Sequence, residues 1–306
     1  MTVLNTLLPV VFLILLGGLL AKIRFLGPAF TNDLNKLAFW AALPALIFRS
    51  AVEAGVPRPA TLVLFCLLAV STLFICGLAI FLSRLLRVPP ASSGAVAQAA
   101  FRGNLAYVGI PVLTYAATTA ELQARLPDAV VTMTLLMVVY NALAVAVLVG
   151  SRQSPVKTVR DILTNPLLIS GLLGLAWGSL QIPMPLAIDR TLSALGAASV
   201  PIALLCIGGT LSFRAAPGRN LAAGLAVTLK IVASPALVWL LAHLAHLGPE
   251  DTKYAVILAA CPTAAASYVM AEKSGGDGPL TSLAIATSTI LAAPVLFAVL
   301  WVFQSG

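Results

Sequence analysis

The sequence predicts an all-α, polytopic membrane protein, and three observations support this fold class. Of the 306 residues, 60% are hydrophobic and only 9% are charged, whereas a soluble globular domain has about 25% charged residues. Apolar runs follow one another with short loops between them, and a spanning helix needs about 20 such residues. The runs are continuous, as in residues 62–82, and do not alternate like the strands of a membrane barrel. The spans are therefore expected to be helices, which satisfy their own backbone hydrogen bonds.

Ten spans are predicted, with clusters of Pro and Gly marking the loops between them. The first run has no basic segment before it and is long enough to cross, so it is interpreted as a retained helix and not as a signal peptide. The four cysteines fall inside predicted spans, where cysteine is usually a small apolar filler. The predicted spans are residues 3–22, 32–52, 59–83, 92–116, 128–150, 163–181, 189–212, 220–246, 252–272 and 279–303.

The loop charges predict the orientation of these spans. One set of loops collects ten Lys and Arg residues, and the opposite set collects four, together with six acids. Because cytoplasmic loops carry the excess of positive charge, both termini are expected outside, which is the periplasmic side of a bacterial inner membrane. The net charge of +8 is accordingly assigned to contacts with anionic lipid headgroups, and nucleic acid is not expected as a partner.

Five spans on each side of the loop at 151–165 predict two inverted repeats, residues 1–150 and 151–306, because an odd number of spans reverses the second half. The fourth and ninth spans are both interrupted, at Gly103-Asn104 and at Pro262. Glycine tolerates unusual backbone angles, and proline removes an intrahelical hydrogen bond. Matching interruptions in inverted halves indicate a transporter binding site, where exposed helix N-termini favour carboxylates.

The broken spans carry a resemblance to a known family. The run Gly-Asn-Leu-Ala-Tyr-Val-Gly-Ile-Pro at 103–111 resembles the fourth-helix motif of the auxin efflux carrier family. The run Ala-Ala-Cys-Pro-Thr-Ala-Ala-Ala-Ser-Tyr-Val-Met-Ala-Glu-Lys at 259–273 is similar to the ninth-helix motif of that family. The resemblance extends over essentially the whole chain, and the short central loop is similar to that of bacterial members.

This resemblance implies the fold of the bile acid:sodium symporter superfamily. Spans 1, 2, 6 and 7 would form a scaffold, often a homodimer, and spans 3–5 and 8–10 would form a transport domain that moves as an elevator. By position, Asn104 matches the crossover Asn that contacts substrate carboxylate in the plant carriers, and Pro262 matches the crossover Pro. The plant carriers have Pro where this chain has Gly103. Bacterial members are linked to small carboxylates such as malate or malonate.

The two basic residues deepest in the spans each have two interpretations. Arg102 adjoins the predicted crossing and either clamps a substrate carboxylate with its guanidinium fork, or pairs with freed backbone carbonyls or turns toward the cytoplasm. Lys230 either snorkels to the interface or has a functional role. The candidate substrate-binding residues are Asn104, Gly103, Arg102, Pro262, Thr263, Tyr107, Ser267, Tyr268 and Asn141.

The sequence therefore predicts a secondary transporter for a small organic anion, auxin-like or malate- or malonate-like, with no cofactor. No Asp or Glu lies deep in a span, so uniport or exchange and symport with Na+ or H+ of the bile acid or organic acid type all stay open. An intramembrane enzyme would need a paired-acid, Ser-His or metal constellation, and His243 with His246 offers at most a two-ligand pair. A receptor or channel would lack paired broken helices. No enzyme activity is expected.

Overall fold

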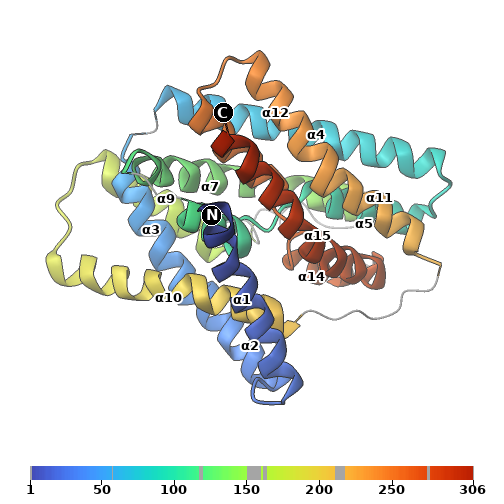
Figure 1. The fold of residues 1–306 in the computed structure, drawn as a ribbon, viewed down its shortest axis with the longest axis horizontal. Helices are drawn as coiled ribbons and strands as arrows, with labels where there is room; N and C mark the ends of the chain where they lie inside the picture. The colour runs from blue at the N-terminus through green and yellow to red at the C-terminus, as the bar shows by residue number, and fades with distance from the viewer. Residues whose placement is uncertain are drawn as a thin grey trace. The chain divides into compact units, whose positions relative to one another are not determined.

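The computed structural model describes residues 2–56, 58–116, 120–149, 160, 164–210, 218–273 and 276–305. Helices dominate this part of the chain (Figure 1). Three of them contain a π-helical turn, labelled η. The elements are α1 (Thr2–Lys22), α2 (Pro28–Leu37), η1 (Ala38–Ala42), α3 (Leu43–Ala54), α4 (Pro59–Leu85), α5 (Pro90–Phe101), η2 (Leu105–Gly109), α6 (Ile110–Ala116), α7 (Ala120–Val149), α9 (Pro166–Ser179), α10 (Leu186–Thr210), α11 (Asn220–Thr228), η3 (Leu229–Ala233), α12 (Ser234–Leu244), α13 (Pro249–Ala260), α14 (Ala266–Lys273) and α15 (Gly278–Ser305).

Proline sets many of the helix starts. The helices α2, α4, α5, α9 and α13 all have proline as their first residue. The first helical position suits proline because its missing N–H would have no intrahelical partner there, and its fixed φ angle is already helical. The Pro-rich loops of the sequence are therefore the places where helices begin after each reversal of the chain.

The predicted spans agree with the helices, and the chain is a multi-pass, all-α membrane protein. Six helices are long and apolar enough to cross a membrane, and three shorter apolar helices accompany them in the described residues. The total of ten spans in two inverted repeats stays a prediction. Most of the central loop at 151–165, which separates the predicted halves, lies outside the described residues.

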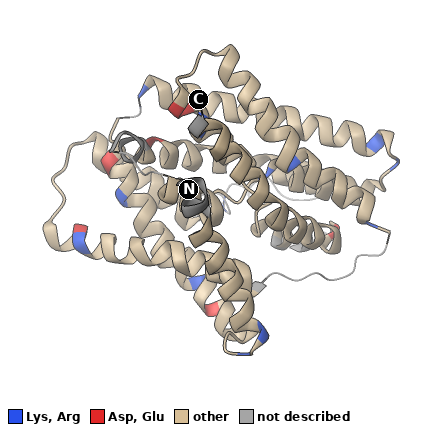
Figure 2. Ribbon diagram, in the orientation of Figure 1, with Lys and Arg blue, Asp and Glu red and all other residues tan. Residues whose placement is uncertain are grey.

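The largest departure in span boundaries is at α7, which begins at Ala120 and not at 128 as predicted. Residues 120–127 include Glu121, Gln123 and Arg125, so hydropathy could not assign them to a span. Pro127 lies inside the helix, where it gave a false signal for a helix start. Figure 2 shows the general pattern, in which most of the ribbon is uncharged and the charged residues lie mainly near helix ends.

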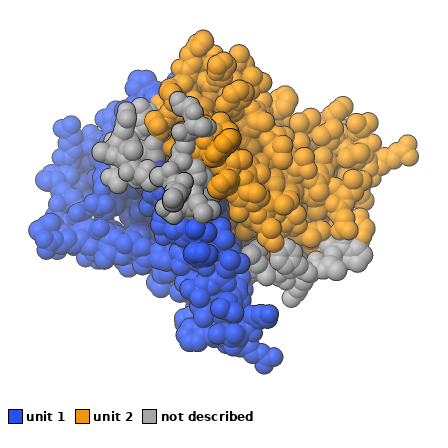
Figure 3. Space-filling view, in the orientation of Figure 1, with its two compact units in different colours: residues 1–63, 106–135, 161–211 blue, residues 64–105, 136–160, 212–306 orange. Residues whose placement is uncertain are grey.

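The described helices form two compact units, drawn in different colours in Figure 3. Unit 1 comprises residues 1–63, 106–135 and 161–211, and unit 2 comprises residues 64–105, 136–160 and 212–306. The division falls within α4 and α7 and directly before Ala106. The assignment of whole spans to a scaffold or a transport domain therefore stays a prediction.

Unit 1 is built on two close helix pairs, α1 with α10 and α3 with α9. A Cβ at Gly17 of α1 would overlap the Leu205 carbonyl of α10, and a Cβ at Gly208 would overlap the Ile14 carbonyl. Lipid gives helices no hydrophobic reason to associate, so close backbone approach through small residues supplies the packing attraction. The close spacing of α1 and α10 therefore requires glycine at these two positions.

Unit 2 packs small residues between α5, α11 and α15. Its most buried cluster is mainly alanine and valine, with Ala99, Ala226 and Ala284 fully buried. The turn η3 contacts α5, α13 and α15, which places its residues in the interior of the unit. This small-residue core brings the ends of α5 and α13 close to η3, where the candidate site lies.

Candidate functional site

The fourth and ninth spans are broken at the predicted positions. The helix α5 ends at Phe101, and helical structure resumes at Leu105. The helix α13 ends at Ala260, and α14 begins at Ala266. The backbone between the segments is extended, with φ and ψ of −83° and 99° at Arg102.

The two unwound segments pair with each other as a short antiparallel bridge between Gly103 and Thr263. Within a membrane, a backbone group freed by a helix break must find a partner inside the protein. The flanking hydrogen bonds run from the N–H of Asn104 to the carbonyl of Pro262 at 2.7 Å, and from the N–H of Ala264 to the carbonyl of Arg102 at 2.9 Å. Each break thus satisfies backbone groups of the other, and we call residues 102–104 with 261–264 the crossing.

Side chains satisfy carbonyls in the last turns of both helices that end at the crossing. The Thr263 hydroxyl donates to the Ala99 carbonyl of α5 at 2.8 Å, and the Lys230 ammonium donates to the Ala259 carbonyl of α13 at 2.9 Å. The Thr263 N–H donates to the Ser288 hydroxyl oxygen at 3.0 Å. Carbonyls in a last helical turn lack intrahelical partners, so these contacts replace bonds that an unbroken helix would make.

Arg102 lies half-buried at the crossing with neutral partners. Its guanidinium donates to the Asn141 side-chain oxygen at 2.8 Å and lies 2.8 Å from the Met270 sulfur. No Asp or Glu of the described residues forms an ion pair with it. A guanidinium has five N–H donors, and thioether sulfur is a weak acceptor. The predicted pairing of Arg102 with backbone carbonyls is not among its contacts, and its side chain keeps the capacity to bind an anion.

The other predicted site residues divide between buried and peripheral positions. Asn104, Asn141 and Ser267 are buried in unit 2, whereas Tyr268 is 41% exposed. Tyr107 belongs to unit 1, where its hydroxyl donates to the side-chain oxygen of Asn35 at 2.7 Å. In unit 2 the structure therefore brings together six of the predicted residues, which are Arg102, Gly103, Asn104, Asn141, Pro262 and Thr263. The hydroxyl of Tyr107 makes its hydrogen bond within unit 1.

The prediction that Lys230 snorkels to the interface is wrong. Its side chain is 1% exposed, and its nitrogen bonds the end of α13. A Cβ on Gly103 would lie 3.3 Å from that nitrogen, so the ammonium lies directly against the crossing. Hydropathy places Lys230 ten residues after the start of the predicted span at 220–246, but it cannot show that the packing of η3 turns the side chain inward.

One polar residue of this region escaped the sequence prediction. Gln98 is fully buried in α5, its amide nitrogen faces the Met270 sulfur at 3.7 Å, and its side-chain oxygen has no hydrogen-bond partner among the described residues. Ser267, which was predicted, likewise has an unpartnered hydroxyl. Buried polar atoms usually have hydrogen-bond partners. The Gln98 oxygen and the Ser267 hydroxyl are therefore polar groups near the crossing that could still form a hydrogen bond. Gln98 lies one helical turn before Arg102, and that spacing could have identified it.

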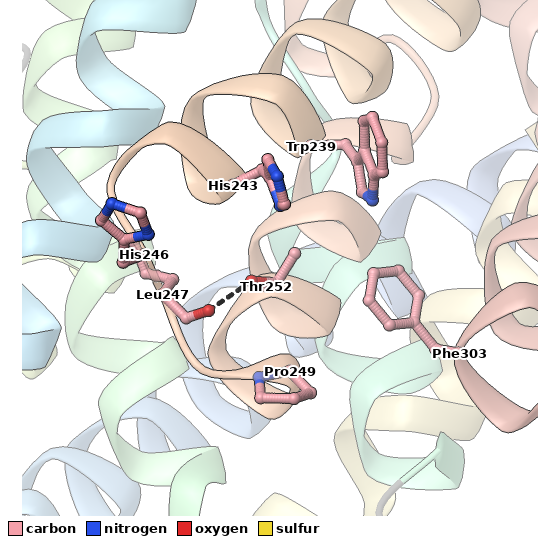
Figure 4. Close-up of a pocket in the computed structure, with 7 residues that line it drawn as sticks. All are labelled: Trp239, His243, His246, Leu247, Pro249, Thr252 and Phe303. Carbon is pink, nitrogen blue, oxygen red and sulfur yellow. Dashed lines mark hydrogen bonds between the residues drawn. The ribbon is translucent and has the colours of Figure 1, made fainter. Parts of the chain in front are cut away.

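A separate pocket of about 390 Å³ lies in unit 2 at the ends of α12, α13 and α15. Figure 4 shows its lining, including Trp239, His243, His246 and Phe303. His243 stacks on Trp239 with ring centroids 6.0 Å apart. In the described residues no group of three or more His, Cys, Asp or Glu could hold a metal. The pocket lining contains no Lys, Arg, Asp or Glu, and the pocket is not the site predicted for an anion.

A partly buried ion pair ties the starts of three helices together in unit 2. The Arg219 guanidinium before α11 donates to Asp277 before α15 at 2.7 Å, and the Ser92 hydroxyl of α5 donates to the same carboxylate at 2.7 Å. Burial alone would raise the pKa of Asp277, but the hydrogen bonds from Ser92, the Leu280 N–H and Arg219, with the charge of Arg219, together hold its pKa below the ordinary value. The carboxylate is therefore ionised where it holds these helices.

Comparison with known proteins agrees with the motifs. A family sequence model described as Membrane transport protein matches residues 2–300. A Rhizobium meliloti protein named "Putative malonate transporter" is 29% identical over 315 residues, covering 98% of this chain and 95% of that protein. A Methanothermobacter thermautotrophicus protein named "Uncharacterized transporter" is 27% identical over 290 residues, covering 94% of each. The family and these relatives indicate a membrane transporter, a class of protein that is generally not enzymatic. The chain belongs to the membrane transport protein family, the auxin efflux carrier family that its broken helices resemble.

Proposed function

We propose that this protein is a secondary transporter that moves a small organic anion, and that the anion binds at the crossing. The observation that carries the proposal is the environment of Arg102. Its guanidinium lies at the meeting point of two broken helices with only neutral partners among the described residues. A charge inside a membrane span is costly and is usually paired. A substrate carboxylate would supply the missing counter-charge and match the guanidinium fork.

The local charge favours a dicarboxylate. The Lys230 ammonium lies against Gly103, the residue after Arg102, so two cationic side chains flank one short segment. The described residues place no carboxylate in an ion pair with either cation. Such an excess of positive charge favours a dianion such as malonate or malate over a monoanion such as an auxin. The name of the Rhizobium meliloti relative supports the same substrate class.

The mechanism that we propose is alternating access of the elevator type. Two inverted five-helix repeats, residues 1–150 and 151–306, would place the fourth and ninth spans in opposite orientations. The antiparallel bridge between Gly103 and Thr263 supports such an arrangement, because it joins corresponding breaks of the two halves. Spans 1, 2, 6 and 7 would form the scaffold and a homodimer contact, and the remaining spans would carry the anion.

We also propose a bacterial inner membrane location with both termini in the periplasm, as the loop charges predict. The alternatives for energy coupling are uniport or exchange, driven by the anion gradient and the membrane potential, and symport with Na+ or H+. A carboxylate at the crossing would favour cation symport. The crossing instead contains Arg102 and lies against the Lys230 ammonium, which favours uniport or exchange.

Flux measurements in proteoliposomes test the proposal. Protein-loaded vesicles should accumulate radiolabelled malonate or malate faster than protein-free vesicles, and unlabelled dicarboxylate should compete. Indole-acetate is the monoanion comparison. If none of the three acids moves and none raises the unfolding temperature of the purified protein, the proposal is wrong, because a ligand that binds the folded state must stabilise it.

A further inference from the structure

Lys230 is a buried cation that the proposed anion site does not need as a direct ligand. It lies in the π-helical turn η3, is 1% exposed, and donates to the Ala259 carbonyl in the last turn of α13. Buried charges in membrane spans are usually paired with an opposite charge or with backbone carbonyls. In the described residues Lys230 has no carboxylate in an ion pair. The carbonyl end of α13 is therefore its counter-charge.

We propose that the Lys230 ammonium is a built-in cation for the carbonyl end of α13, so that the crossing needs no bound metal cation and anion transport is independent of Na+. The inference rests on the proposed transport function and concerns the same site. Lys230 acts as a positioning residue, because it holds α13 and the Gly103 segment in place without reaching the anion.

The two helices that end at the crossing differ in the side chain that satisfies a carbonyl of their last turn. The end of α5 is satisfied by a neutral hydroxyl, since Thr263 donates to Ala99. The end of α13 is satisfied by an ammonium, since Lys230 donates to Ala259. Helix C-termini carry partial negative charge and are stabilised by cations. An ammonium and a metal ion both meet that need, but only the ammonium is covalently fixed.

The ammonium also lies directly beside the carbonyl end of α13. Its nitrogen lies 2.9 Å from the Ala259 oxygen, so a metal ion bound to the same carbonyl would lie close to the ammonium. It lies against Gly103, where the absence of a Cβ leaves room for it. A second cation placed beside these carbonyls would be repelled by the first. The charge of the ammonium therefore disfavours Na+ at this end of the crossing.

The first test compares Na+ with a large organic cation. Uptake of radiolabelled malonate by wild-type protein in proteoliposomes, measured in sodium and in N-methylglucamine buffers of equal ionic strength and pH, should agree within about twofold. The unfolding temperature of the purified protein should also be the same in sodium and in choline chloride. Stimulation of uptake by Na+, or a rise in unfolding temperature specific to Na+, would overturn the inference.

The second test removes the charge. Lys230→Gln keeps a donor but no charge, and should lower the maximal uptake rate about tenfold. The apparent KM for malonate should rise no more than about threefold, because the Lys230 charge acts on the dianion only at long range and the side chain does not touch it. Lys36→Met removes an exposed lysine and is the matched control with wild-type kinetics. An unchanged rate, or an effect confined to KM, contradicts the positioning role. The wild-type salt comparison of unfolding temperature remains decisive if Lys230→Gln does not fold or if the protein moves no anion.

Discussion

At the scale of single residues, Arg102 has donor capacity that its contacts with the described residues leave unused. It contacts one amide oxygen and one thioether sulfur, although its guanidinium can donate five hydrogen bonds. Sequence alone left its role open, because a basic residue next to a broken helix can serve either the backbone or a ligand. The structure assigns the freed carbonyl of Arg102 itself to the Ala264 N–H. That contact removes one reason for the guanidinium to turn back to the backbone.

Arg102→Gln should weaken dianion binding more than monoanion binding. A hydrogen bond to a charged group contributes about 1.5–3 kcal/mol, so the apparent KM for malonate should rise about 10- to 100-fold, with a smaller rise for a monocarboxylate. Concentration-dependent uptake of both substrates in proteoliposomes measures the difference. Arg190→Gln, at an exposed position of α10, is the control. Equal effects on both substrates would make Arg102 a structural residue.

Lys230 marks the limit of sequence analysis at this scale. Its position in a span was predicted, but its direction was not, because the same helical position can face lipid or protein. The outcome depends on η3, which packs among α5, α13 and α15. Such contacts between distant segments are absent from a hydropathy profile. The contact of the Tyr107 hydroxyl with Asn35 was unpredictable for a related reason, because the two residues are far apart in the sequence.

At the scale of elements, the two breaks were predictable because local chemistry causes them. Gly103 and Asn104 weaken a helix, and Pro262 removes a backbone donor. The ranges of the predicted spans also follow from hydropathy and from proline at helix starts. The partners of the freed backbone groups were not predictable, because they lie on the other broken helix. Only the structure could join the Ala99 carbonyl with Thr263.

The substitutions Asn104→Ala and Pro262→Ala should each abolish uptake and leave membrane insertion intact. The first removes the side-chain amide at the crossing, and the second restores a backbone donor that lets α13 continue as a helix. Uptake of radiolabelled dicarboxylate and surface expression measure the two effects. Pro28→Ala is a control for the second variant, because Pro28 begins α2 and replaces no internal hydrogen bond. Normal uptake in both crossing variants would reject the crossing as the binding site.

Thr263→Val should destabilise unit 2, whereas Thr263→Ser should be close to wild type. Valine has a similar shape but leaves the buried Ala99 carbonyl without its 2.8 Å donor. An unsatisfied buried acceptor costs about 1–3 kcal/mol. Thermal unfolding of the purified variants, followed by tryptophan fluorescence, gives the comparison. Equal stability of the valine and serine variants would show that the hydroxyl contact is dispensable.

At the scale of the whole molecule, charge is concentrated where it can hold helix ends together. Asp277 connects Arg219, Ser92 and the Leu280 N–H, and thereby joins α11, α5 and α15. Composition and loop charge predicted a membrane protein with basic loops. They could not predict which loop acid pairs with which base, since residues 219 and 277 are far apart in the chain.

The stability of the protein should therefore depend on pH through Asp277. Its pKa is held below the ordinary value in the folded state, so its stabilisation is complete at neutral pH and is lost as pH falls below about 4, the usual pKa of an aspartate. Asp277→Asn should unfold at a lower temperature than wild type at pH 7, and the difference should shrink toward pH 3.5. Thermal unfolding across this range provides the measurement. A difference that is constant with pH would exclude this linkage.

The hydrogen bonds of the crossing also bear on how the substrate range of this protein can evolve. The N–H groups of Asn104, Thr263 and Ala264 already donate within the protein, so they are not free to recognise a ligand. Selectivity must then reside in replaceable side chains, such as Arg102 and Asn141. A lineage can exchange those side chains for others without rebuilding the backbone that supports them. One family can in this way acquire new substrates by point mutation while its crossed helices stay the same.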